Sequence, residues 1–265
     1  QPAGKDSTAG ITGRRSSGGP WKKSSNMTKM NPAFIENVLT TFIREEFKKL
    51  GFQRAIIGLS GGIDSSVAAF LAARALSPAN VVALIMPYGH SFSQDVKDAQ
   101  EIAHQLGLAS QIIDITPMID AYFQKYPTEN KILKGNKMAR ERMSILYDFS
   151  ARHQALILGT SNKTELLLGY GTIHGDMASA INPLGDLYKT QIRLLARHLG
   201  VPEKIITKTP TAGLWPGQTD EGELGLSYEE IDQILFHLVD QRLPREAVIN
   251  HGFPATKVDR IISLI

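Results

Sequence analysis

The sequence predicts an α/β fold with a doubly wound, mainly parallel sheet flanked by helices. Short apolar runs of strand type occupy residues 55–59, 81–86, 111–115 and 155–158, and segments of helical character separate them. Strands that alternate with helices are typical of parallel sheets. Polar or glycine-rich segments directly follow several of these runs, at the edge where ligands of such sheets bind. We therefore expect a ligand site along the carboxyl edge of one sheet.

Composition limits the class of protein. The chain has 265 residues, enough for one sizeable α/β domain or two small ones, and 42% of them are hydrophobic, which suits a globular core. There is no cysteine, which excludes disulfides, thiolate metal sites and cysteine nucleophiles and fits a cytoplasmic location. No apolar run approaches the roughly 20 residues needed to cross a bilayer, so no membrane partner is expected.

Positive charge is concentrated at the start of the chain. Residues 1–29 have a net charge of +5 and the whole chain has +3, so the remainder has −2. A nucleic-acid-binding protein carries its basic excess on the folded part, so we expect no nucleic-acid partner. The Gly/Ser/Thr-rich composition of residues 1–29 predicts a flexible basic leader or an artificial extension. A single domain is expected over residues 30–265.

Helix signals separate the strand-type runs. Asn31 and Pro32 predict a helix start, apolar residues follow at helical spacing, and Gly51 ends the helix, which we expect to pack in the core or at a subunit interface. Residues 67–75, 94–106, 117–125, 192–199 and 228–238 also predict helices, and small helices are expected to close the domain. Residues 127–134 are expected to be a connection.

The strongest functional signal is the segment after the first strand, G-L-S-G-G-I-D-S-S at residues 58–66. A glycine turn between strand and helix leaves unpaired N–H groups at a helix N-terminus, where phosphate binds. A Walker loop needs a lysine after the glycines, and a dinucleotide fingerprint needs another spacing. Asp64 beside a phosphate requires a cation, and Mg²⁺ is held by one or two carboxylates together with phosphate oxygens. The alternative is an ordinary turn with Asp64 as a first-turn acid.

The string S-G-G-I-D-S resembles the pyrophosphate-binding loop of the adenylate-forming ATP pyrophosphatases, which cleave ATP to AMP and pyrophosphate. Four further strings resemble the NAD synthetase family and occur in its order, at residues 135–143, 156–165, 182–191 and 209–221. The resemblance implies an adenine nucleotide alpha-hydrolase-like, Rossmann-like fold. It implies ATP contacts at Gly58, Leu59, Ser60, Gly61, Gly62, Ile63, Asp64, Ser65, Ser66, Thr160, Lys189 and Thr211.

The same resemblance assigns the remaining site residues. Glu165 is implied to complete a Mg²⁺ site with Asp64, while Asp64 and Lys189 are the implied catalytic residues. Arg140 is the implied contact for deamido-NAD, and Asp176 is a further candidate for that substrate.

Two of these residues also raise questions from the sequence itself. Arg140 and Arg142 cannot share one helix face, so one of them can point to ligand and the other to solvent. Lys189 precedes a predicted helix start, where a cation is disfavoured unless a phosphate is bound there.

Residues 209–221 are polar and glycine-rich, so they predict a mobile active-site cover, with a plain surface loop as the alternative.

The resemblance implies an ammonia-dependent ligase at the last step of NAD biosynthesis. ATP would adenylylate the nicotinate carboxylate of deamido-NAD, and ammonia would displace AMP. The absence of cysteine argues against a glutamine-using amidase, so ammonia is expected to arrive free or from a separate protein. A homodimer is implied by resemblance.

Two other functions remain open at this stage. Another amidating ATP pyrophosphatase, such as a GMP-synthetase-like enzyme, is disfavoured by the strings at 162–165 and 186–191. A non-catalytic adenine-nucleotide sensor has less need of both Asp64 and Glu165. The chain departs from many family members at Ile173 and Ala180, where they have Lys and Asp, and it stops before a basic tail motif found in relatives.

Overall fold

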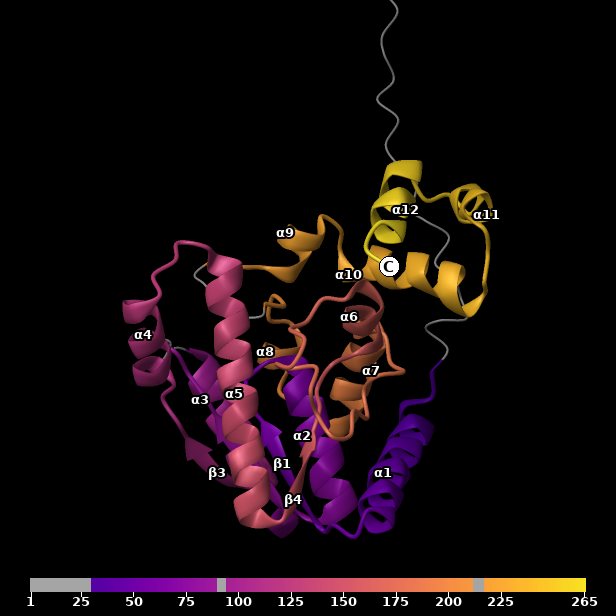
Figure 1. The fold of residues 1–265 in the computed structure, drawn as a ribbon. Coiled ribbons are helices and arrows are strands. Elements are labelled where there is room, and N and C mark those ends of the chain that lie inside the picture. The colour runs from indigo at the N-terminus through magenta and orange to yellow at the C-terminus, as the bar shows by residue number, and fades with distance from the viewer. Residues whose placement is uncertain (1–29, 90–93, 212–216) are drawn as a thin grey trace, which may run out of the picture.

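The computed structural model describes residues 30–89, 94–211 and 217–265. The predicted leader, the end of the loop after the second strand and the middle of the predicted cover lie outside the described residues. The described chain contains one four-stranded parallel sheet in the order β3-β2-β1-β4, which confirms the predicted fold class (Figure 1). The strands are β1 (Arg54–Gly58), β2 (Val81–Ile85), β3 (Ala109–Ile112) and β4 (Ala155–Leu158).

Helices cover both faces of this sheet. On β1, Ala55 and Ile57 point to one face and Ile56 to the other, as the two-residue period of a strand requires, and all three are fully buried. The first face packs against α1 (Pro32–Lys49), α2 (Ile63–Leu76), α3 (Gln94–Leu106), α7 (Lys189–Leu199) and α8 (Glu203–Ile206). The second face packs against α4 (Thr116–Lys125) and α5 (Lys131–His153). Burial on both faces explains why the central strands are continuous apolar runs.

The helix starts follow their capping residues. Asn31 caps α1 as predicted, its side chain accepting from two first-turn amides. Asn130 caps α5 in the same way, so α5 begins inside the segment that we expected to be a connection. The N–H of Tyr188 donates to the side chain of Gln191, and α7 accordingly begins three residues before the predicted start.

The third strand differs from its prediction because burial and pairing do not coincide there. The sequence predicted residues 111–115, where the apolar side chains lie, but the paired strand β3 is Ala109–Ile112. β3 is an edge strand whose residues are exposed. The buried Ile115 instead lies at the start of α4, under the second face of the sheet.

A second apolar core lies at the C-terminal end of the chain. It is built by helices α9 (Asp220–Leu224), α10 (Tyr228–Leu235), α11 (Arg245–Asn250) and α12 (Ala255–Ile262). Leu168 from α6 (Lys163–Leu168) and Tyr188 before α7 belong to the same core, so α6 and α7 connect it to the sheet (Figure 1). The predicted helix 228–238 continues past Leu235 as a π-helical turn, η2 (Phe236–Asp240). In the first half of the chain, a short 3-10 turn, η1 (Pro78–Asn80), precedes β2. Among the described helices, none combines the length and apolarity that a membrane span requires.

Candidate active site

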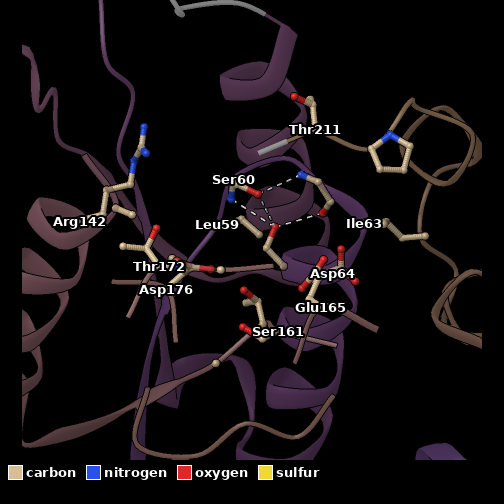
Figure 2. A pocket seen from close by; sticks show the side chains of 18 of the residues that line it. Leu59, Ser60, Ile63, Asp64, Arg142, Ser161, Glu165, Thr172, Asp176 and Thr211 are labelled. Carbon is tan, nitrogen blue, oxygen red and sulfur yellow. Dashed lines mark hydrogen bonds between the residues drawn. The ribbon is translucent and has the colours of Figure 1, made fainter. Parts of the chain in front are cut away.

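The turn between β1 and α2 forms the floor of a cavity of about 790 Å³ lined by described residues at the carboxyl edge of the sheet. Gly61 has a φ of +79°, and a Cβ there would lie 2.2 Å from the backbone oxygen of Asp95, so the tight turn needs glycine. The hydroxyls of Ser60 and Ser65 are 3.1 Å apart and bond the backbone of the turn (Figure 2). These bonds hold the loop in one shape.

The start of α2 is open to an anion. Gly62 occupies the N-cap position and has no side chain with which to cap the first turn. The first amides of a helix lack intrahelical partners and lie at its positive end. Ser60, Gly62, Ile63 and Ser65 all line the cavity, so the open first turn faces it; phosphate binding there stays a prediction.

Asp64 and Glu165 meet at one point of the cavity although they come from different helices (Figure 2). The Nζ of Lys189 lies between them, 2.5 Å from Asp64 Oδ2 and 3.4 Å from Glu165 Oε1. Lys189 is only 3% exposed. Two carboxylates therefore compensate the cation at the start of α7, which resolves the conflict with the helix dipole without a phosphate.

The protonation of this group follows from burial and charge together. Burial acts to lower the pKa of Lys189, but the two carboxylates outweigh it and the net pKa is raised, so the lysine is a cation. Burial raises the pKa of Glu165, and the charge of Lys189 opposes this rise. The two carboxylates are close enough to share one cation, and in this structure that cation is the Lys189 ammonium.

Asn162 connects the two acids and was missed by the sequence analysis. It is fully buried, and its Nδ2 donates to Asp64 Oδ1 over 3.0 Å. Its Oδ1 accepts from the N–H of Glu165, while the Glu165 carboxylate accepts from the N–H of Asn162. The N-cap asparagine followed three residues later by glutamate is a capping-box pattern, which is a local signal that could have identified it.

A second acidic group, also missed, lies beside the first. Asp220 is 4% exposed, lines the cavity and accepts hydrogen bonds from the hydroxyls of Tyr170 and Tyr228. Tyr170 also donates to Glu223 over 2.6 Å. Burial raises the pKa of Asp220. No local motif predicts this group, because its members come from three separate segments.

Across the cavity from Asp64, Arg142 lies near Thr172 and Asp176 (Figure 2). The Nε of Arg142 donates to the backbone oxygen of Met86, and burial lowers its pKa to about 10. The Asp176 carboxylate accepts from the N–H of Thr172, and burial raises its pKa. This side of the cavity thus combines a partly buried guanidinium with a carboxyl group.

Most predicted site residues lie in the wall of this one cavity. Those that line it are Gly58, Leu59, Ser60, Gly62, Ile63, Asp64, Ser65, Thr160, Glu165, Asp176, Lys189 and Thr211. Gly61, Ser66 and Arg140 are not among the described residues of the wall: Gly61 faces Asp95, and the Ser66 hydroxyl donates back to Gly62 O.

The two neighbouring arginines of α5 have different surroundings. Arg140 is exposed and its Nε donates to Ile173 O, whereas Arg142 lines the cavity. Within the described chain the structure therefore places Arg142 at the site, and the role predicted for Arg140 stays a prediction. Among the described residues, no three or more His, Cys, Asp and Glu side chains form a group that could hold a metal ion.

The chain is similar in sequence to a known family along most of its length. A family model described as NAD synthase matches residues 35–265. An NH(3)-dependent NAD(+) synthetase of Chlorobium phaeobacteroides is 52% identical over 231 residues, which are 87% of this chain and 83% of that protein. A protein of the same description from Fusobacterium nucleatum is 48% identical over 89% of this chain and 92% of its own length.

Solved structures agree with this likeness. An NH3-dependent NAD synthetase from Campylobacter jejuni, in complex with nitrate, superposes with a TM-score of 0.76 and 36% identity over 89% of this chain and 93% of that one. A structure described as NMN synthetase from Francisella tularensis has a TM-score of 0.78 and 35% identity, with the same shares covered.

Proposed function

The chain belongs to the NAD synthase family, and from this premise we propose that it is a ligase that amidates deamido-NAD to NAD with ammonia and ATP. The observation that carries the proposal is one cavity in which the open start of α2 meets Asp64, Glu165 and Lys189. The relatives described above are named NH(3)-dependent NAD(+) synthetases, which supports the ammonia-dependent formation of NAD.

The first half-reaction activates a carboxylate that ammonia cannot attack directly. A nicotinate carboxylate oxygen of deamido-NAD attacks the α-phosphorus of ATP, and the bond from that phosphorus to the bridging oxygen breaks. The electron pair leaves with pyrophosphate. The amides at the start of α2, which have no partner within the helix, are proposed to bind the departing negative charge, and the Lys189 ammonium is proposed to compensate it further at the same point.

We propose Asp64 and Glu165 as the residues that would hold Mg²⁺. Their fit to a cation is supported by the ammonium group that lies between them. When bound with ATP, Mg²⁺ would neutralise charge on the phosphates, and it commonly takes one or two carboxylates plus phosphate oxygens.

The second half-reaction transfers the acyl group to nitrogen. The nitrogen of ammonia attacks the acyl carbon of the adenylate, the carbon–oxygen bond breaks, AMP leaves, and the nitrogen loses a proton. No side-chain nucleophile is needed, because placing the two reactants together supplies much of the acceleration. The NH(3)-dependent relatives support ammonia as the nitrogen source.

Residue roles follow as proposals. Thr160, Lys189 and Thr211 are proposed ATP contacts, supported by their place in the cavity wall. Asp176 is a proposed deamido-NAD contact with the same support. Arg140 remains proposed for that substrate on resemblance, although it lies outside the described wall of a single subunit.

The chain is also proposed to act as a cytoplasmic homodimer with one domain over residues 30–265. A family match over residues 35–265 supports the single domain. Exposed apolar side chains on α4, at its C-cap and at the start of α5 support a subunit contact; they are Met118, Tyr122, Tyr126, Ile132 and Leu133. Analytical ultracentrifugation tests the dimer, and a monomer at micromolar concentration contradicts it.

The reaction is tested by incubating the purified chain with deamido-NAD, ATP, Mg²⁺ and ammonium. Equal amounts of NAD, AMP and pyrophosphate are expected, with no NAD when glutamine replaces ammonium. Labelled ATP in a single turnover separates the alternatives, because a sensor yields no AMP and a GMP-synthetase-like enzyme ignores deamido-NAD. A parallel reaction with nicotinate mononucleotide tests the mononucleotide activity named for the Francisella protein. Preference for that substrate would contradict the proposal.

A further inference from the structure

Asp232 is a fully buried carboxylate that lies between two helix starts. It belongs to α10, in the C-terminal core, and is 0% exposed. Its Oδ1 accepts from the hydroxyl of Thr164 over 2.6 Å, and its Oδ2 accepts from the N–H of Thr190 over 2.8 Å. Asp232 is not among the described residues that line the cavity. Any effect of Asp232 on the site would have to pass through other residues.

The two residues that Asp232 binds are sequence neighbours of the proposed site residues. Thr164 precedes Glu165 in the first turn of α6, and Thr190 follows Lys189 in the first turn of α7. The Thr164 hydroxyl also accepts from the N–H of Lys189 over 3.0 Å. A continuous chain of hydrogen bonds thus connects the Asp232 carboxylate of α10 to the Thr164 side chain of α6 and to the first two backbone amides of α7.

The ionised carboxylate fixes the direction of this chain. A carboxylate can only accept, so the Thr164 hydroxyl must donate to it and has lone pairs left for the N–H of Lys189. An amide at position 232 would present one donor and one acceptor in place of two acceptors. The geometry therefore depends on the charge of the side chain as well as on its shape.

We propose that Asp232 is a positioning residue of the ligase reaction, holding the starts of α6 and α7 in register and so setting the places of Glu165 and Lys189 around Asp64. This inference rests on the proposed function of that site. It also gives the C-terminal core a role in the reaction, because α10 is the element that brings Asp232 to the two helices.

A buried carboxylate of this kind lowers the stability of the folded chain. An ionised carboxylate in an apolar environment costs free energy even when it is hydrogen-bonded. Burial raises the pKa of Asp232 to about 6, and its bonds to Thr164 and Thr190 only partly oppose this rise. Such an unfavourable group is typically retained where it fixes the geometry of a functional site.

The test compares Asp232→Asn with the same substitution at an exposed carboxylate on a helix of the C-terminal core. Asp259→Asn is the control, since Asp259 pairs with Arg245 between α12 and α11 and does not touch α6 or α7. Each folded variant is assayed for kcat, KM for ATP and the Mg²⁺ dependence of NAD formation, and its unfolding free energy is measured in urea. Loss of a hydrogen bond to a charged group predicts a roughly ten- to hundredfold fall in kcat/KM for ATP in Asp232→Asn, with a higher Mg²⁺ requirement. The control should match the wild type.

A second pair of variants keeps the test decisive if Asp232→Asn does not fold. Thr164→Val removes the hydroxyl at nearly constant shape, whereas Thr164→Ser keeps it. The inference predicts loss in the first and rescue in the second, and no additional loss when Thr164→Val is added to Asp232→Asn. Stability alone does not predict a changed Mg²⁺ dependence in folded enzyme. Wild-type kcat, KM and Mg²⁺ dependence in both Asp232→Asn and Thr164→Val would overturn the inference.

The outcome is separable from that of the proposed function. A wild-type chain that forms no NAD contradicts the function, and binding of Mn²⁺–ATP to the wild type and to Asp232→Asn then still reports on the site. Weaker binding in Asp232→Asn supports the positioning role, and equal binding refutes it.

Discussion

Replacing Lys189 with methionine should convert the cavity into a tighter binding site for divalent cations. In the wild type the lysine ammonium lies between Asp64 and Glu165, where it is almost completely buried. A metal ion that enters without nucleotide must displace this ammonium. Lys189→Met removes the competitor and leaves two carboxylates without a compensating charge.

The magnitude follows from the energetics of buried ion pairs. Removing one partner of such a pair leaves an uncompensated charge and costs about 3–5 kcal/mol. A metal ion that binds to the variant relieves this cost, which corresponds to a dissociation constant lower by about a hundred- to a few thousandfold. The variant should also be less stable in EDTA and should recover stability when Mn²⁺ is added.

The assay is a titration with Mn²⁺ in the absence of nucleotide, with free Mn²⁺ measured by electron paramagnetic resonance. Lys208→Met is the matched control, because Lys208 also lines the cavity but pairs with Asp95 and Asp98. Its Mn²⁺ affinity should be that of the wild type. If Lys189→Met bound Mn²⁺ no more tightly than this control, the reasoning about a shared cation site would be refuted.

Three further predictions concern the loop, the far wall and the buried acid. Gly61→Ala should lower kcat/KM for ATP by about a hundredfold, since a Cβ there would lie 2.2 Å from the Asp95 backbone oxygen and would shift the loop. Gly107→Ala is the control: Gly107 also has a positive φ but nothing within 4 Å of an added Cβ, so this variant should lose stability without a change in kcat/KM. Arg142→Met should raise the KM for a substrate anion by about ten- to hundredfold, because a partly buried guanidinium in the cavity wall is lost. Unchanged KM values for both ATP and deamido-NAD would contradict this. The pKa of Asp232 is raised on folding to about 6 by burial, so its contribution to stability is fully present below the unfolded pKa near 3.8 and is lost as pH rises through 6. The unfolding free energy of the wild type relative to Asp232→Asn should therefore fall by about 3 kcal/mol between pH 3.5 and 7, and a difference that does not change with pH would exclude the raised pKa.

The parts of the site that sequence could predict are those encoded locally. The turn at residues 60–65 needs its glycines and serines in one short string, and its phosphate-binding shape follows from strand, turn and helix. Asp64 and Glu165 were identified separately, each just past a strand, and a parallel sheet brings such positions to the same edge. The fold class followed from the same alternation of strands and helices.

The parts that could not be predicted depend on packing between distant segments. The position of Lys189 between two acids depends on the packing of α7 against α2. Asp220 lines the cavity, and Asp232 contacts Thr164 and Thr190, only because the C-terminal core packs on α6 and α7. The two arginines of α5 show the same limit. Their spacing shows that they diverge, but only the packing of α5 on the sheet decides that Arg142 lines the cavity.

The most direct measurement of the central claim is a crystal structure of the chain with the α,β-methylene analogue of ATP and Mg²⁺. We predict the β- and γ-phosphates on the amides at the start of α2 and the metal between Asp64 and Glu165, with the Lys189 ammonium moved from the carboxylates to the phosphates. A triphosphate bound elsewhere in the cavity, or a metal that contacts neither acid, would contradict the account.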